Sequence, residues 1–213
     1  MGRMQRGILG GFVGKVGTVI GSQRNGMDII SSLPKKSSKA ATQDQKDVRN
    51  KFGMAIAFMQ PINQVLRLGF KSSDPRLSPI NLAVSYFIKN AITGATDAYE
   101  IDYPNVLISK GELSPGWNTL ATATDPQEVK IGWTNTTSSG LAQPDDEVLA
   151  VVYNASKGQH LMAIGGIMRS AGELVLEMPL DYTGDVVHSW LAFISKDKKL
   201  KSTSSYAGLV TIL

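Results

Sequence analysis

Apolar residues in the second half of the chain recur in short runs separated by turn residues. Val129, Ile131 and Trp133 alternate with polar or small residues, and residues 174–178 show the same alternation. This period of two predicts strands with one buried face. Seven runs are expected to be strands: 106–109, 129–134, 147–153, 161–168, 174–178, 186–194 and 206–212.

One of these runs, residues 148–153, is apolar on both faces, which predicts a central strand. Seven strands in about 110 residues is the number expected of an immunoglobulin-like sandwich. The chain has no cysteine, so the expectation concerns the architecture and not the disulfide of antibody domains. We therefore expect a seven-stranded antiparallel immunoglobulin-like β-sandwich.

The first part of the chain shows a different pattern. Glycines punctuate residues 7–33 at a density that opposes a helix. Asn25-Gly26 lies between two apolar runs, which is a signal for a hairpin turn. A glycine-rich arm and a hairpin are expected here, followed by a basic, serine-rich linker over residues 34–41.

Helical spacing begins after this linker. Thr42 and Gln45 have the spacing of a capping box, and Pro61 should end the helix that follows. Its predicted buried stripe is Val48, Phe52, Ala55, Ile56 and Met59. A second short helix should follow Pro61. A third should have Ser78 as its N-cap and stop at Gly94.

The predicted fold class is therefore α+β, in two regions. Residues 1–96 should form the basic arm, the hairpin and two to three helices, and residues 97–213 the β-sandwich domain.

Charge divides the chain at a different place. The net charge is +4, but residues 1–76 contain thirteen basic and four acidic groups, and residues 77–213 contain nine and fourteen. The first part is thus +9 and the second −5. This asymmetry favours contact of the first part with an anionic partner, either nucleic acid or an acidic protein surface.

Candidate chemistry is sparse. The two histidines, His160 and His188, lie 28 positions apart, and cysteine is absent, so no metal site is expected. Gly14-Lys15 fails the phosphate-loop pattern, because Leu9 and Val16 occupy positions that require glycine and serine or threonine. We expect no catalytic residue, no cofactor and no enzymatic activity.

Two short matches are interpreted as turns. Residues 195–198 fit S-x-x-K but follow a predicted strand and enter a lysine-rich segment. Asp145-Asp146-Glu147 is the one acidic cluster and precedes the most apolar strand.

The N-terminus lacks the pattern of a secretory signal. Glycines and Lys15 interrupt the apolar stretch at residues 8–20, and no run approaches the length of a membrane span. We expect a cytoplasmic protein, or one incorporated into a particle or filament.

Several segments are similar to a known family. They are GILGGFVGKVGTVIGS at the opening, SLPKK, KFGMAIAFMQPIN, YEIDYPNVLISKGEL, DDEVLAVVYN and SSYAGLVTIL. The chain resembles a domain-of-unknown-function family common in Bacteroidetes over residues 6–213. The resemblance implies one recurrent two-part architecture and carries over no catalytic or binding residue.

Three functions compete at this stage. The first is a structural, self-assembling subunit, for example of a phage-like particle or a filament, that contacts other copies of itself through its arm. The residues expected at that contact are Ile8, Leu9, Phe12, Val13 and Val16.

The second function is nucleic-acid binding by the basic region. Its expected contact residues are Arg3, Arg6, Lys15, Arg24, Lys35, Lys36 and Lys39. The third is a sandwich module that binds a carbohydrate or a protein, with Trp117 as its one candidate residue.

Overall fold

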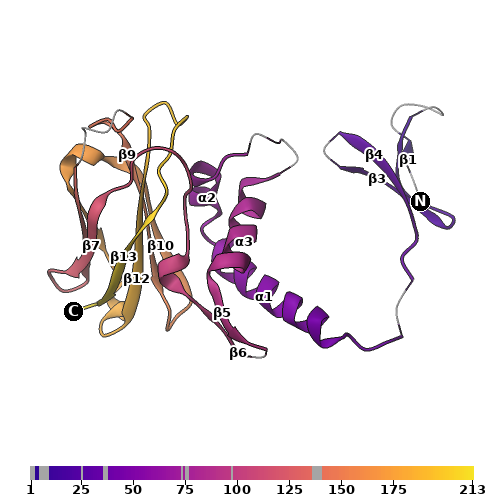
Figure 1. The fold of residues 1–213 in the computed structure, drawn as a ribbon, viewed down its shortest axis with the longest axis horizontal. Helices are drawn as coiled ribbons and strands as arrows, with labels where there is room; N and C mark the ends of the chain where they lie inside the picture. Colours follow the sequence, from indigo (N-terminus) through magenta and orange to yellow (C-terminus); the bar gives the residue numbers. More distant parts are fainter. Residues whose placement is uncertain are drawn as a thin grey trace. The chain divides into compact units, whose positions relative to one another are not determined.

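The computed structural model describes residues 3–4, 10–24, 26–35, 38–72, 74, 77–96, 98–135 and 141–213. Two compact units make up the chain. Unit 1 comprises Met1–Gln43 and Asp74–Arg76, and unit 2 comprises Asp44–Ser73 and Leu77–Leu213. Figure 1 shows unit 1 as a small sheet and unit 2 as helices with sheets.

Unit 1 is a four-stranded antiparallel sheet in the order β1-β2-β3-β4. Its strands are β1 (Arg3–Met4), β2 (Phe12–Val16), β3 (Val19–Arg24) and β4 (Met27–Ser32). The predicted hairpin is confirmed, since Arg24 pairs with Met27 and Gly26 takes a φ of 80°. The arm before it also contains a strand, β2, which turns back into β3 at Gly17 (φ 58°).

Three helices follow, as the sequence predicts. They are α1 (Gln43–Met59), α2 (Asn63–Gly69) and α3 (Pro79–Asn90). Pro61 separates α1 from α2, and the Ser78 hydroxyl caps α3 by accepting from the Asn81 N–H at 3.3 Å. Gly94 does not stop α3, which ends four residues earlier.

Gly94 instead belongs to a hairpin that the sequence did not reveal, formed by β5 (Ile92–Ala95) and β6 (Ala98–Ile101). Its φ of 93° and its close approach to the Ala98 backbone explain the glycine. The expected boundary between the regions 1–96 and 97–213 falls between the paired strands β5 and β6. It does not coincide with the division between the two units, which leaves the helices together with the sandwich.

Two antiparallel sheets complete unit 2. The four-stranded sheet has the order β10-β9-β12-β13, and the three-stranded sheet has the order β11-β8-β7. Their strands are β7 (Trp117–Ala123), β8 (Glu128–Thr134), β9 (Glu147–Asn154), β10 (Gln159–Met168), β11 (Glu173–Glu177), β12 (Val186–Ile194) and β13 (Ser205–Thr211).

Six of the predicted runs are strands in the structure. The run at 106–109 is not, because it is an irregular segment after a short 3₁₀-helix, η1 (Tyr103–Asn105). Strand β7 was missed, since its segment has a turn-rich sequence around Gly116 and Asn118. The expected central position of residues 148–153 is confirmed, because β9 lies between β10 and β12.

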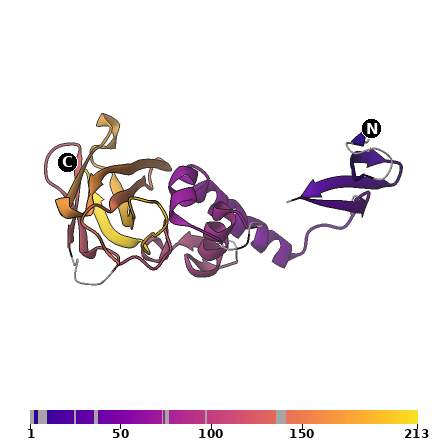
Figure 2. The ribbon, with the colours of Figure 1, turned by 90° about the horizontal axis from the view of Figure 1, so that it is seen from above.

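The four-stranded sheet is buried on both faces. Val148, Ala150 and Val152 of β9 face the three-stranded sheet, in one core with Leu191 and Phe193 of β12. The alternate residues of the same strands face the other way. There Val151 and Trp190 share a second core with the helices, which contribute Phe58, Leu66 and Phe87. Unit 2 therefore has three layers, as Figures 1 and 2 show.

Aromatic rings join the sheet to the helical layer. His160, Tyr153 and His188 lie side by side across β10, β9 and β12. Phe58 of α1 packs against His160 at 4.8 Å between ring centroids. His188 stacks on Tyr103 at 3.8 Å, and its Nδ1 lies 2.7 Å from the Tyr206 hydroxyl. His188 is therefore packed among aromatic rings, with Trp190 and Tyr206 beside it.

The acidic cluster contains a buried ion pair. Asp146 Oδ2 lies 3.0 Å from Arg169 Nε, and both side chains are almost completely buried. Arg169 also donates to the Ser114 carbonyl oxygen at 2.7 Å and lies over the Phe193 ring. Asp146 Oδ2 accepts from the Gln143 N–H, so this carboxylate holds the turn before β9. The interpretation of the cluster as a turn agrees with the structure.

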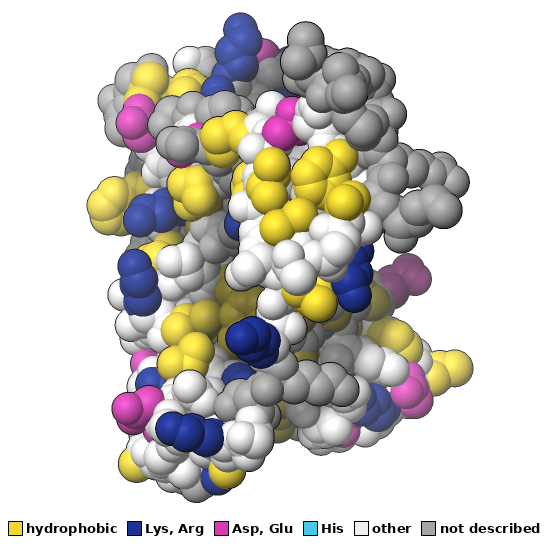
Figure 3. Space-filling view, turned by 90° about the vertical axis from the view of Figure 1, so that its right-hand side faces the viewer, with side chains coloured by type: hydrophobic (Ala, Val, Ile, Leu, Met, Phe, Trp, Pro, Cys, Tyr) yellow, Lys and Arg dark blue, Asp and Glu magenta, His cyan; other side chains and the backbone are white. Residues whose placement is uncertain are grey.

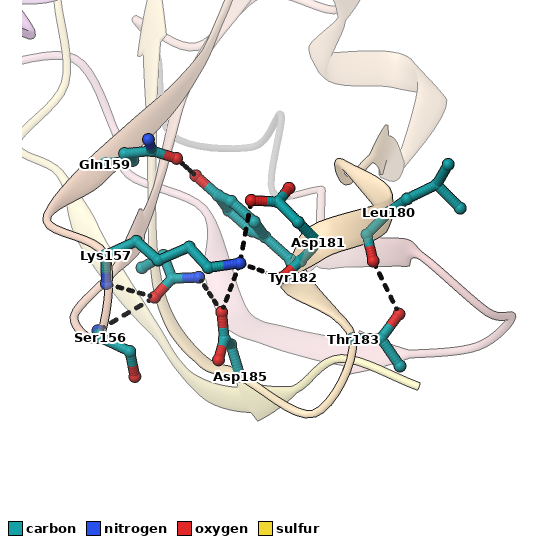
Figure 4. A network of polar contacts seen from close by, with 9 residues as sticks. Ser156, Lys157, Gln159, Leu180, Asp181, Tyr182, Thr183 and Asp185 are labelled. Atoms are coloured by element: carbon teal, nitrogen blue, oxygen red, sulfur yellow. Dashed lines mark hydrogen bonds and ion pairs between the residues drawn. The ribbon is translucent and has the colours of Figure 1, made fainter.

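A polar network holds the β9–β10 turn (Figure 4). Asn154 donates to Asp185 at 2.7 Å and accepts from two turn N–H groups. Lys157 Nζ lies 3.0 Å from Asp181 Oδ2 and 3.2 Å from Asp185 Oδ2. The hydrogen bonds from Asn154 and then Lys157 lower the pKa of Asp185. Asn154 thus satisfies backbone N–H groups of the turn, and Lys157 is paired with the carboxylates of Asp181 and Asp185. The charged groups here therefore have a structural role.

We predict that Asp146→Ala lowers the free energy of unfolding by about 3–5 kcal/mol, because it leaves Arg169 buried without its counter-ion. Denaturant unfolding measures this loss. Asp145→Ala is the matched control, since Asp145 is partly exposed and lies 3.7 Å from Lys196; it should change stability by less than about 1 kcal/mol. Equal losses in both variants would contradict the role of the buried pair.

Burial lowers the pKa of His160 from 6.5 to about 4, and neither ring nitrogen has a hydrogen-bond partner among the described groups. Because the pKa of His160 is lower in the folded state than in the unfolded state, burial of the neutral ring leaves the free energy of unfolding unchanged above pH 6.5. The free energy of unfolding should decrease as the pH falls from 6.5 towards 4. NMR titration should give a pKa near 4, and His160→Phe should be less sensitive to acid than the wild type. A pKa near 6.5 would contradict the buried environment.

Candidate interaction surface

The described residues of the N-terminal sheet form no core of their own. Gly21 is the only buried residue among the described residues of unit 1. Val16 is 50% exposed, Ile30 is 66% exposed, and all six residues of β4 are exposed. A small antiparallel sheet normally requires a hydrophobic face packed against another element to be stable. The described residues of unit 1 include exposed hydrophobic side chains that such a packed face would bury.

Both faces of the sheet carry apolar side chains. Val16 pairs with Val19, and Gly21 pairs with Ile30, so Val16, Val19 and Ile30 share one face. The opposite face is made of the side chains that alternate with these, namely Lys15, Ile20, Arg24, Met27 and Ile29. A partner can therefore bury apolar area on either side.

The Phe12 ring lies over Gly21 on the first face. A Cβ added at Gly21 would be 2.6 Å from Cδ2 of Phe12, so only glycine allows this contact. The ring explains why Phe12 is half-buried while its neighbour Val13 is exposed. Gly21 thus has a structural reason that the sequence pattern did not indicate.

Three of the five expected contact residues, Phe12, Val13 and Val16, lie together on β2. The other two, Ile8 and Leu9, lie outside the described residues. The structure adds residues of β4 to this surface, above all Ile29 and Ile30, which the sequence placed only in a hairpin. Their exposure could not be inferred, since apolar strands usually have a buried face.

The expected basic residues are distributed over the same unit. Lys15 and Arg24 are exposed on one face of the sheet, and Lys35 and Lys39 are exposed in the segment after β4. The Arg3 backbone pairs with Val13, while Arg6 and Lys36 lie outside the described residues. Figure 3 shows exposed hydrophobic side chains with those of Lys and Arg near them.

Unit 2 has an apolar surface that was expected to be buried. Val48 and Phe52 of α1 are 68% and 51% exposed, so the first half of the predicted stripe is not core. Phe52 lines a hollow of about 310 Å³ together with Val84 and Ile88 of α3. Helical spacing predicted the face correctly. It did not show that α1 extends beyond the elements that cover it.

The other candidates offer less. Trp117 on β7 is 58% exposed, and the next exposed apolar side chain on its strand is Leu120. The S-x-x-K match is a turn between β12 and β13, as expected, with Lys198 at a φ of 57° and its N–H bonded to the Ser195 carbonyl oxygen.

Within the described ranges, no three His, Cys, Asp or Glu residues lie close enough to hold a metal ion. The helices in the part of the chain that the structure describes are too short or too polar to cross a membrane.

Comparisons with known proteins match one family model and several distantly similar solved structures, including the following two. The fibronectin type III domain of human collagen alpha-1(XX) chain is 14% identical, with a TM-score of 0.37, and the match covers 47% of this chain and 88% of that one. The FN1–FN3 domains of chicken CNTN1 are 8% identical, with a TM-score of 0.31, and the match covers 47% and 30%. No curated protein matches the sequence. The model of one family matches residues 11–208, and the chain therefore belongs to the family of unknown function DUF6266.

Proposed function

We propose that the protein is a non-enzymatic structural subunit that assembles with other copies of itself through its N-terminal sheet. One observation carries this proposal: unit 1 has paired strands but exposes its apolar side chains on both faces. Exposed contiguous apolar surface of this kind marks interaction sites. The whole edge of β4 is also exposed, and such an edge can pair with another chain.

The surface that receives the sheet is the hollow around Phe52 on another copy. It combines the exposed side chains of Val48 and Phe52 with the α3 residues Val84 and Ile88. A contact between two different surfaces of the same chain is heterologous, and it generates a ring or a filament according to the rotation between copies. We also propose that the sandwich is immunoglobulin-like, and its four-stranded and three-stranded antiparallel sheets support this.

A second candidate function is nucleic-acid binding. It is favoured by the position of Lys15 and Arg24, which are exposed on the same face of the sheet. Their side chains can reach phosphates without rearrangement of the strands. A carbohydrate- or protein-binding sandwich has only Trp117 in its support.

We predict that the full chain forms oligomers at micromolar concentration, and that Val16→Ser/Ile30→Ser shifts it to the monomer. The two substitutions remove exposed apolar area from one face of the sheet, and neither of the replaced residues is buried. Phe52→Ser should weaken the same assembly from the receiving side. Chromatography with light scattering measures the mass of each variant.

Leu180→Ser is the matched control, since Leu180 is an exposed apolar residue of unit 2 that does not line the hollow. It should assemble as the wild type does. A wild-type protein that stays monomeric would overturn the proposal, and so would assembly that Val16→Ser/Ile30→Ser does not change.

For the nucleic-acid alternative, Lys15→Gln/Arg24→Gln should weaken binding of a DNA duplex and reduce the dependence on salt. The variant has two fewer cationic side chains to contact phosphates. The slope of the logarithm of the binding constant against the logarithm of the salt concentration should therefore become less steep by about 2. Fluorescence anisotropy over a salt series measures this slope. Binding that is undetectable at low salt would remove the alternative and leave the assembly proposal untouched.

A further inference from the structure

Four lysines surround one hollow on unit 2. The hollow has a volume of about 420 Å³. Its lining residues are Lys71, Lys110, Gly111, Glu112, Lys199, Leu200 and Lys201. They come from the segment after α2, the irregular segment before β7 and the segment before β13, so the fold brings together cations that are far apart in sequence. We call this site the lysine hollow.

Lys201 is the unusual member, because its side chain is buried and has no carboxylate partner among the described ion pairs. The residue is 7% exposed, and its Nζ donates to the Leu68 carbonyl oxygen at 2.7 Å. That bond uses one of the three ammonium donors and places the charge at the C-terminal end of α2. Buried charges are normally paired or bound to a ligand. The two remaining N–H donors of Lys201 are therefore suited to binding an anion.

The backbone is built around this lysine. A Cβ at Gly111 would be 2.6 Å from Cγ of Lys201, so the glycine allows the side chain to pass. The Leu113 N–H donates to the Lys201 carbonyl oxygen at 2.9 Å. Ser109 Oγ lies 3.1 Å from the Gly69 oxygen and 2.7 Å from the Ser202 oxygen, which joins the three segments. The position of Lys201 is therefore fixed.

The charges around it do not cancel. Burial first, and then the nearby charge of Lys71, lower the pKa of Lys201, which shows that the two cations repel each other. Two carboxylates oppose the cations: Glu112 lines the hollow, and Asp197 lies 3.3 Å from Lys199 at the surface. Lys110 Nζ also lies 5.4 Å from the centre of the Tyr86 ring. Four cations thus face one carboxylate on the wall and another at the rim.

We propose that the lysine hollow binds a small phosphate-class anion, either the free ion or the phosphate group of a phosphorylated small molecule. A phosphate group carries a charge of about −1.5 to −2 and three acceptor oxygens on one centre, so it can meet several ammonium groups at once. A single carboxylate has half that charge. Lysine serves such groups as a point charge, without the planar geometry that arginine needs. The volume accommodates a phosphate together with a small substituent.

Isothermal titration calorimetry of the full chain at pH 7 and constant ionic strength tests this site with three probes: inorganic phosphate, ribose 5-phosphate and ribose. The variant Lys71→Gln/Lys199→Gln removes two exposed charges of the hollow, and its Kd for phosphate should rise about tenfold or more. The control Lys35→Gln/Lys46→Gln removes the same charge outside the hollow and should change Kd by less than roughly twofold. Lys201→Met, which keeps the apolar stem, should abolish binding, with circular dichroism to show that it is folded.

Tighter binding of ribose 5-phosphate than of phosphate would assign a phosphorylated small molecule, and equal binding would assign the free ion. Both results support the site. Binding of ribose as tight as that of ribose 5-phosphate would overturn it, as would the same loss in both double variants or no heat with either phosphate probe. These results are independent of oligomer mass, so the site and the assembly proposal can fail separately.

Discussion

The structure depends on a sheet that is buried on both faces. Strands β9 and β12 present one set of side chains to the three-stranded sheet and the alternate set to the helices. Trp190 and Val151 would face water if the helices were absent, so the helices and the sandwich form one folding unit rather than two domains. The aromatic row across β10, β9 and β12 and the packing of Phe58 follow from the same constraint.

Unit 1 differs from unit 2 in the exposure of its apolar side chains. The helices and the three-stranded sheet cover the faces of the central sheet with residues of unit 2 itself. The N-terminal sheet differs, since its described residues include apolar side chains that are exposed on both faces, such as Ile29 and Ile30. Strand β4 keeps six consecutive residues exposed, and three of them, Met27, Ile29 and Ile30, are apolar. It therefore combines an edge strand with apolar surface, and both can take part in assembly. The exposed basic residues of unit 1 would attract an anionic surface electrostatically.

Local patterns in the sequence predicted the elements well. Pro61, Ser78-Pro79 and Asn25-Gly26 act on their immediate neighbours, and the structure follows each of them. Alternation predicted β8 and β11, and two-sided hydrophobicity predicted the central position of β9. The sequence did not predict strand β7 or the β5–β6 hairpin, because their short segments contain few large apolar residues and show no strong apolar signal. The exposure of Phe52, the boundary between the units and the meeting of Lys71 with Lys201 depend on long-range packing, which spacing along the chain does not contain.

We propose that another copy of the chain covers the N-terminal sheet. Hydrogen exchange of the wild-type protein, followed by mass spectrometry at low and high protein concentration, distinguishes a covered sheet from an exposed one. We predict that the amides of residues 12–32 become more protected as the concentration rises, while those of β9 and β12 stay equally protected throughout. Protection of residues 12–32 that does not change with concentration would contradict it.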